Sequence, residues 1–161
     1  MKGAFLVRLI IATSLYTIMG RATVWFDPIS NAILVFGSRF FLVFSPFFFS
    51  RLQANAIPAA TLLAALGSAL ILLPNQFFFV IGATCLAIGV SVAGYLIRAY
   101  ASENIGAAAQ NKIAINCGVI LAGITLSLPI QNNTTIALIS FVFLLIASYV
   151  ARHIVASRTH I

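Results

Sequence analysis

Long apolar stretches separated by short polar ones occupy most of this chain. Six stretches have the length and hydropathy of membrane-spanning helices: residues 3–20, 29–50, 58–73, 77–97, 113–130 and 136–150. A helix needs roughly 20 residues to cross a bilayer, so six such segments use almost the whole chain of 161 residues. We therefore expect an all-α membrane protein, with six transmembrane helices in a single domain over residues 1–161.

The composition agrees with this pattern. Hydrophobic residues make up 62% of the chain and charged residues only 7%, and the mean hydropathy is +1.12. No soluble enzyme, receptor ectodomain or nucleic-acid module fits into what remains. The net charge of +7 comes from nine Lys and Arg residues scattered at helix ends. We interpret these residues as topology signals that contact lipid headgroups, and we expect no nucleic-acid partner.

The basic residues also predict the orientation of the protein in the membrane. With six spans, only Arg21 falls clearly on one side of the membrane. The other side holds Lys2, Arg8, Arg51, Arg98, Lys112, Arg152 and Arg158. The positive-inside rule then places both termini in the cytoplasm, and we expect the inner membrane of a bacterium as the location. The first apolar stretch has the outline of a signal peptide, but Arg8 interrupts it. We therefore expect a retained first helix.

Small residues recur at four-residue spacing in three of the expected helices. They are Ala60 and Ala64 in the third, Cys85, Gly89 and Ala93 in the fourth, and Ala114, Gly118 and Ala122 in the fifth. Small residues let helix backbones approach closely, which promotes helix association in lipid. These stripes predict helix-packing faces. They do not indicate what the protein does.

Arg39 is the candidate for a solute contact. It lies near the middle of the second span, where a guanidinium is costly unless it meets water or a partner. Neither acid of the chain, Asp27 or Glu103, matches it in depth. Arg39 could bind an anionic substrate or an acid of a partner subunit. It could equally bond to carbonyls and hydroxyls of neighbouring helices, or extend along a tilted helix to the headgroups. Asn116, in the fifth span, is the second substrate-binding candidate.

Other polar residues carry weaker hypotheses. Arg8 is close enough to the end of the first span for its long side chain to reach the headgroups, so we interpret it as an anchor. The polar stretch from Arg98 to Lys112 is expected to be a loop, either a solvated hairpin or a cytoplasmic gate. The gating hypothesis assigns Arg51, Arg98 and Glu103 to that gate.

The sequence contains no set of residues typical of catalysis or metal binding. Ser91 lies within the fourth span, but no histidine lies within the membrane to act as its base. The two cysteines, Cys85 and Cys117, fall in apolar segments and are expected to be small packing residues. We expect no enzyme activity, no metal site and no cofactor.

The pattern as a whole resembles one six-helix half of a major facilitator superfamily transporter. The helix number and orientation match, and Ser50-Arg51-Leu52 occupies the place of that family's charged loop after its second helix. The fourth and fifth spans resemble its glycine-rich helix pair, with Gly82, Gly89, Gly94, Gly118 and Gly123. The sequence departs from the family's loop motif, because Ser50 stands in place of the Asp and Pro46 in place of the leading Gly.

The resemblance implies one of two functions. In that family the substrate cavity lies between two halves, so a single half would have to form a dimer or pair with another chain. The first hypothesis is a half-size secondary transporter that moves a small, anionic solute as a homodimer. The second is a non-transporting accessory or assembly subunit of a larger membrane complex. The Phe-rich second span and the shortage of acids in the membrane favour the second.

Overall fold

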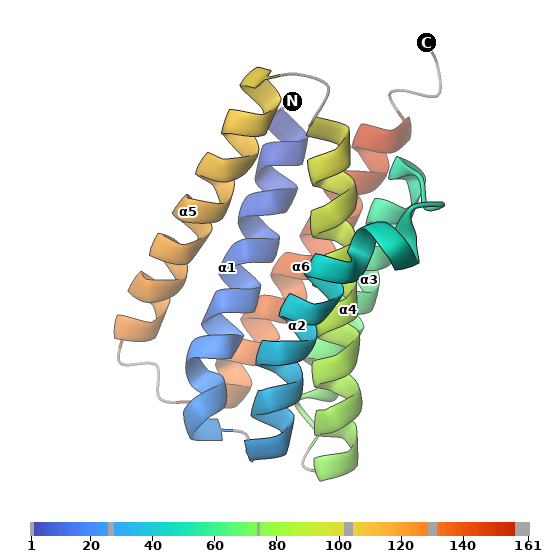
Figure 1. Cartoon of the computed structure of the whole chain (residues 1–161). Helices are drawn as coiled ribbons and strands as arrows, with labels where there is room; N and C mark the ends of the chain where they lie inside the picture. Colours follow the sequence, from blue (N-terminus) through green and yellow to red (C-terminus); the bar gives the residue numbers. More distant parts are fainter. Residues whose placement is uncertain (1, 26–27, 74, 102–104, 129–131, 157–161) are drawn as a thin grey trace.

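The described part of the chain is entirely helical, as the sequence predicts. The computed structural model describes residues 2–25, 28–73, 75–101, 105–128 and 132–156. These residues form six α-helices and one short 3₁₀ helix (Figure 1). In chain order they are α1 (Lys2–Trp25), α2 (Pro28–Phe49), η1 (Ala54–Ala56), α3 (Ile57–Leu70), α4 (Gln76–Ala101), α5 (Ile105–Ser127) and α6 (Asn133–Ala156).

Five of the six described helices are long and apolar enough to cross a membrane: α1, α2, α4, α5 and α6. The chain therefore has the character of an integral membrane protein. The expectation of six full spans needs a correction at α3. This helix has 14 residues, which is about 21 Å of helix and less than a bilayer requires. It begins after η1 and carries Pro58 in its first turn, where the missing N–H of proline costs nothing.

The structure also corrects the expected polar loop from Arg98 to Lys112. Helix α4 continues to Ala101 and α5 begins at Ile105, so Arg98 and Lys112 both lie on helices. Hydropathy marks where a helix leaves the apolar layer, but the Ala-rich, Gln- and Lys-containing sequence after Ile105 still favours helix. Asparagine side chains set two other helix starts. Asn75 Oδ1 accepts the Phe77 N–H at 2.9 Å before α4. Asn132 Oδ1 accepts the Thr134 N–H at 3.0 Å before α6.

Helix α2 continues through Pro46 because a neighbouring side chain replaces the lost hydrogen bond. Proline has no N–H, so it leaves the Leu42 carbonyl without its helical donor. The Ser45 hydroxyl donates to this carbonyl at 2.7 Å. Ser45 is only 1% exposed, so an unpaired carbonyl here would be costly. Serine next to proline therefore keeps the helix intact in an apolar environment.

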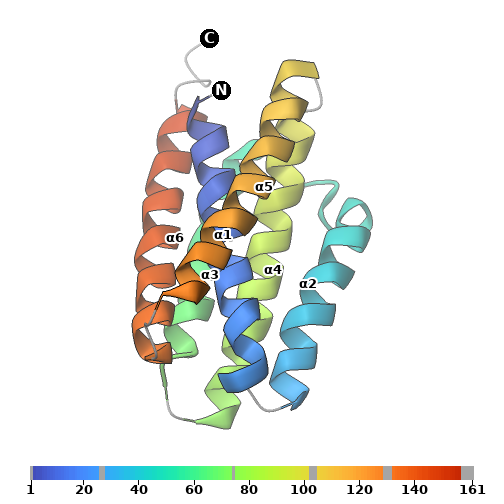
Figure 2. The ribbon, with the colours of Figure 1, turned by 90° about the vertical axis from the view of Figure 1, so that its left-hand side faces the viewer.

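Successive helices run in opposite directions, and the chain starts and finishes at the same end of the bundle (Figures 1 and 2). The start of α1, the last turns of α2, α4 and α6, and the first turns of α3 and α5 all lie at that end. It also carries most of the described basic residues: Arg51, Arg98, Lys112 and Arg152. The basic end predicted from the sequence is thus one physical end of the molecule.

The chain forms two matched units of three consecutive helices, α1–α3 and α4–α6. Helix α1 packs on α5 and α6, and α4 packs in the same way on α2 and α3. Helices α3 and α6 pack on each other, and α1 meets α4 at the centre. Exchanging α1–α3 for α4–α6 therefore leaves the packing pattern unchanged. Because each unit has an odd number of helices, the two units run in opposite directions, as in an inverted repeat.

Glycines bring α3 and α4 into backbone contact. A Cβ added to Gly89 would lie 2.5 Å from the Ala64 nitrogen and 2.6 Å from the Ala60 oxygen. One added to Gly67 would lie 2.6 Å from the Gly82 oxygen. Only a hydrogen atom fits at these positions. Helices without a hydrophobic driving force between them are held together by close packing of this kind.

Helices α1 and α5 form a second close contact of this kind, and Figure 2 shows α5 lying across α1. A Cβ on Gly118 would lie 2.6 Å from the Ala12 Cβ and 3.0 Å from the Thr13 nitrogen. Large side chains fill the interior between these contacts. The largest fully buried aliphatic residues are Ile11, Ile18, Leu34, Ile71, Leu86, Ile136 and Leu144.

Replacing Gly89 with Ala should separate α3 from α4 and lower the free energy of unfolding by about 2 kcal/mol, as overpacked sites do. Unfolding of the detergent-solubilised protein by heat or by sodium dodecyl sulfate would measure this change. Gly123→Ala is the matched control, because a Cβ there meets nothing within 4 Å. Equal stability of the two variants would contradict the packing described.

Ser45→Ala should destabilise the protein by about 1 kcal/mol, because the partly buried Leu42 carbonyl loses its donor. The same substitution made together with Pro46→Ala should cost much less, since the new N–H of residue 46 can bond to that carbonyl. A double-mutant cycle on unfolding free energies measures this coupling. Purely additive effects would show that Ser45 does not act by compensating for the proline.

Candidate functional site

A small cavity lies where the two three-helix units meet, between α1, α2, α4 and α5. Its volume is about 50 Å³. We call it the central cavity. It is lined by Arg8, Ile11, Ala12, Leu15, Tyr16 and Met19 of α1, Ser38, Arg39 and Leu42 of α2, Val90 and Ser91 of α4, and Ile115 of α5. Among the described residues that line it, the two arginines are the charged ones. The apolar walls and few polar groups are typical of solute sites.

Arg8 lines the central cavity, and the end of its side chain lies directly against Gly94 of α4. A Cβ added to Gly94 of α4 would run into Nη1 of Arg8 and would lie 3.2 Å from Cζ. Arg8 Nε is buried and has no hydrogen-bond partner among the described residues. The expectation that the Arg8 side chain reaches the headgroup layer stays a prediction. The Arg8 guanidinium packs between α1 and α4 and faces the centre of the bundle.

Arg39 lines the central cavity from α2. It lies about ten residues from either end of that helix, or roughly 15 Å of helical rise. Its side chain is exposed, so the central cavity reaches the molecular surface. Among the residues that the structure describes, no hydrogen bond or ion pair joins Arg39 to another side chain. Asp27 and Glu103, the only acids of the chain, lie outside the described residues.

Hydroxyl groups fix the floor of the central cavity. The Ser91 hydroxyl of α4 donates to the Ser38 carbonyl of α2 at 3.0 Å, and the Ser38 hydroxyl donates to the Val35 carbonyl at 3.0 Å. Both serines are buried. Ser91, considered above as a possible nucleophile, is thus a link between two helices. This bond holds the backbone that carries Arg39 against α4.

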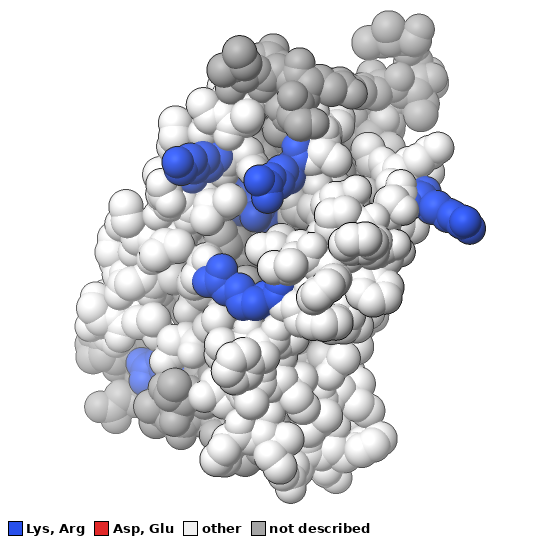
Figure 3. Space-filling view, viewed as in Figure 1, with Lys and Arg blue, Asp and Glu red and all other residues white. Residues whose placement is uncertain are grey.

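The described charged side chains of this face are all basic, and both acids of the chain lie outside the described residues. Figure 3 views the face, and its basic side chains lie at the centre and mostly in the half towards the termini. No acidic side chain appears among the described residues on that face. Nowhere in the described part of the chain do three or more His, Cys, Asp or Glu side chains form a group that could hold a metal ion.

The remaining candidate residues lie apart from the central cavity. Asn116 is exposed on α5 and does not line it, so the structure does not bring Asn116 and Arg39 together. Arg51 is exposed in the turn after α2, and Arg98 is exposed in the last turn of α4. Glu103, the third member of the gating hypothesis, lies outside the described residues.

The small-residue stripes lie at two helix contacts, with one exception. Ala60, Ala64, Gly89 and Ala93 are buried between α3 and α4. Ala114, Gly118 and Ala122 are buried on α5, whose main neighbour is α1. Cys85 is only partly buried. The next close contact along α4 is made by Gly82, two turns before Gly89, with Leu86 between them.

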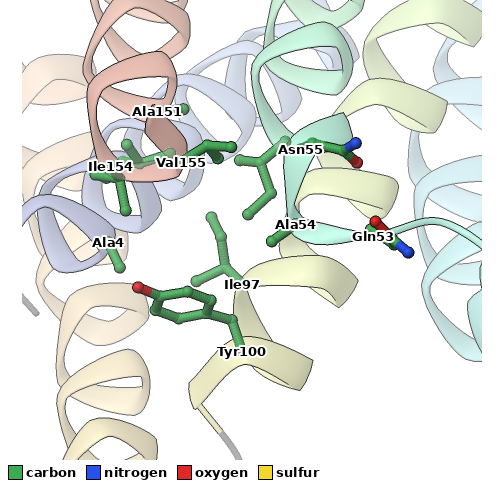
Figure 4. Close-up of a pocket in the computed structure, with 11 residues that line it drawn as sticks. Ala4, Gln53, Ala54, Asn55, Ile97, Tyr100, Ala151, Ile154 and Val155 are labelled. Carbon is green, nitrogen blue, oxygen red and sulfur yellow. The ribbon is translucent and has the colours of Figure 1, made fainter. Parts of the chain in front are cut away.

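A larger cavity of about 260 Å³ opens near the end of the bundle that carries the termini (Figure 4). Aliphatic side chains line most of it, among them Ile97 of α4 and Ile154 and Val155 of α6. In the close-up the Gln53 and Asn55 amides point away from its centre. Among the described residues, no charged side chain lines this cavity, so they offer little to orient a solute there. The central cavity is the better candidate site although it is smaller.

Sequence reasoning identified Arg39 as a candidate but did not predict that Arg8 lines the same cavity. The position of Arg8 near a helix end is typical of an anchor. Only the packing of α1 against α4 shows that the Arg8 side chain lies against Gly94. A glycine at the matching depth of a facing helix is the available signal, but the sequence does not say which helices face each other. Comparison with family models, curated proteins and solved structures finds no significant match.

Thiol labelling can test whether the central cavity is open to water. In a variant lacking Cys85 and Cys117, Arg39→Cys should react with a charged, water-soluble thiol reagent at least about tenfold faster than Phe36→Cys, because the reactive thiolate forms in water. Phe36 is the matched control, since it is 73% exposed on α2 but lies on its aromatic outer face. Equal labelling of the two cysteines in membranes would show that Arg39 does not face a hydrated space.

Proposed function

We propose that this protein is a half-size relative of secondary transporters, which forms a homodimer and moves a small anionic solute across the membrane. The observation that carries the proposal is the inverted pairing of α1–α3 with α4–α6 around a central cavity that holds two arginines. Inverted repeats with the solute site at their meeting point are a recurrent design of such transporters.

The position of α2 and α5 supports the dimer. These helices pack on α4 and α1 and flank the central cavity, which therefore opens towards the surface between them. Both present apolar side chains outwards, such as Phe36 and Phe47 of α2 and Ile120 and Ile124 of α5. A second copy placed over this face would enclose the two arginines away from lipid, where a charge is costly. With the basic end of the bundle in the cytoplasm, both termini would also be cytoplasmic.

A second candidate function, that of an accessory subunit, is supported by the aromatic face of α2. Phe40 packs against Phe44 with ring centroids 4.7 Å apart, and Phe44 lies 6.3 Å from Phe47. Phe47 is 80% exposed. Such a row of rings can pack on the helices of a different protein as well as on a second copy. This function requires a stable hetero-complex and no solute flux.

Liposomes containing the purified full chain should take up labelled inorganic phosphate or a small labelled carboxylate faster than empty liposomes. Arg39→Gln should reduce that uptake at least tenfold, because one charge-assisted contact to an anion is worth about 1.5–3 kcal/mol. Arg152→Gln, at the exposed end of α6, is the charge-matched control and should leave uptake unchanged. Light scattering after mild extraction should give the mass of a homodimer. A stable hetero-complex that shows no uptake would favour the accessory function instead.

A further inference from the structure

We infer that Arg8 and Arg39 together form one binding site for a compact oxyanion, such as the carboxylate or phosphate head of a small organic acid. The inference deepens the proposed function, because it names the chemistry of the solute. It also assigns a binding role to Arg8 and a positioning role to Gly94.

The first argument is electrostatic. Two guanidinium groups line one central cavity, and the described residues supply no carboxylate to either of them. Burial removes hydration from the Arg8 guanidinium, whose Nε atom lies away from solvent without a hydrogen-bond partner among the described residues. An anion in the central cavity would offset that cost and would also contact Arg39, which lines the same cavity. Guanidinium groups suit this task, because their planar donors match carboxylate and phosphate oxygens in pairs.

The second argument is the unused donor. Arg8 Nε is buried without a hydrogen-bond partner, although buried N–H donors are nearly always paired. Burial of the Arg8 side chain is itself a built feature, since α4 carries a glycine where any larger residue would collide with the guanidinium. An oxyanion in the central cavity would satisfy a donor that the described part of the chain leaves free.

The third argument is size. A cavity of about 50 Å³ holds roughly three or four water molecules. That is the size of a carboxylate or a single phosphate group, not of a whole metabolite. Leu15, Met19 and Leu42 form apolar walls beside the arginines. The part of the solute beyond its anionic head is therefore expected to be uncharged, and to extend towards the surface on the side of Arg39.

The test is equilibrium binding to the full chain in nanodiscs of phosphatidylcholine. Inorganic phosphate, sulfate, acetate and benzoate are titrated at constant ionic strength against chloride, and thermal stability is followed. At least one of these oxyanions should raise the unfolding temperature saturably. Arg8→Gln and Arg39→Gln should each weaken that binding at least tenfold, and Arg152→Gln should not. Responses that are equal in all variants, or that never saturate, would overturn the inference.

Gly94→Ala provides a test that removes no charge and does not depend on the stability of Arg8→Gln. Its methyl group would push the flexible end of Arg8 out of place, so anion binding should weaken while Arg39 stays intact. Gly123→Ala adds the same methyl group in open space and should bind anions like the unchanged protein. If Gly94→Ala lowers basal stability but keeps the full anion response, Arg8 has only a structural role and the inference fails.

The same experiment separates a soluble anion from a lipid headgroup. Nanodiscs with phosphatidylglycerol offer a lipid phosphate in place of the added salts. Stabilisation by this lipid that is lost in Arg8→Gln and Gly94→Ala would identify the lipid as the source of the oxyanion. Stabilisation by the lipid that is equal in all variants, together with no response to salts, would overturn the site.

The binding and uptake experiments distinguish failure of the site from failure of the proposed transport. Anion binding without uptake into liposomes would contradict the proposed transport alone. Uptake that is unchanged in both Arg8→Gln and Arg39→Gln would contradict this site alone.

Discussion

The structure depends on the contact between the backbones of α3 and α4. At Gly67, Gly82 and Gly89 the two helices approach so closely that a methyl group would not fit. In water the burial of apolar surface would hold such helices together. In lipid that driving force is absent, and close packing has to supply the attraction. The contact uses one face of α4 and leaves its other faces free, so that α2 and α1 can pack on the same helix.

The same kind of contact recurs between α1 and α5, where Gly118 meets Ala12. Each of the two contacts joins a helix of one three-helix unit to a helix of the other. Helices α2 and α5 then flank the line where the units meet, and the central cavity forms on that line. The cavity is thus a consequence of the packing geometry. Arg8 and Arg39 give it a chemical character by adding two positive charges to a wall that is otherwise uncharged among the described residues.

Hydrogen bonds within and between helices allow this arrangement to contain irregular features. Ser45 supplies the donor that Pro46 lacks. Ser148 of α6 donates to the Pro58 carbonyl of α3 at 2.9 Å, which joins α6 to the short helix. Ser91 joins α4 to α2 at the floor of the central cavity. In each case a small hydroxyl side chain satisfies a backbone carbonyl within the helix bundle.

The sequence by itself determined the helices and the basic end of the bundle, because hydropathy and loop charge are local properties. It located most of the helix starts to within a residue or two, and it singled out Arg39 from its depth in an apolar segment. It missed the helical stretch after Ile105, since hydropathy reports the edge of the apolar layer and not the end of a helix. Only the tertiary structure decided that α1 faces α4, and therefore that Gly94 receives Arg8 beside Arg39. Which residues of two helices meet depends on their rotation and vertical offset, and several combinations of the same small-residue stripes are compatible with one sequence.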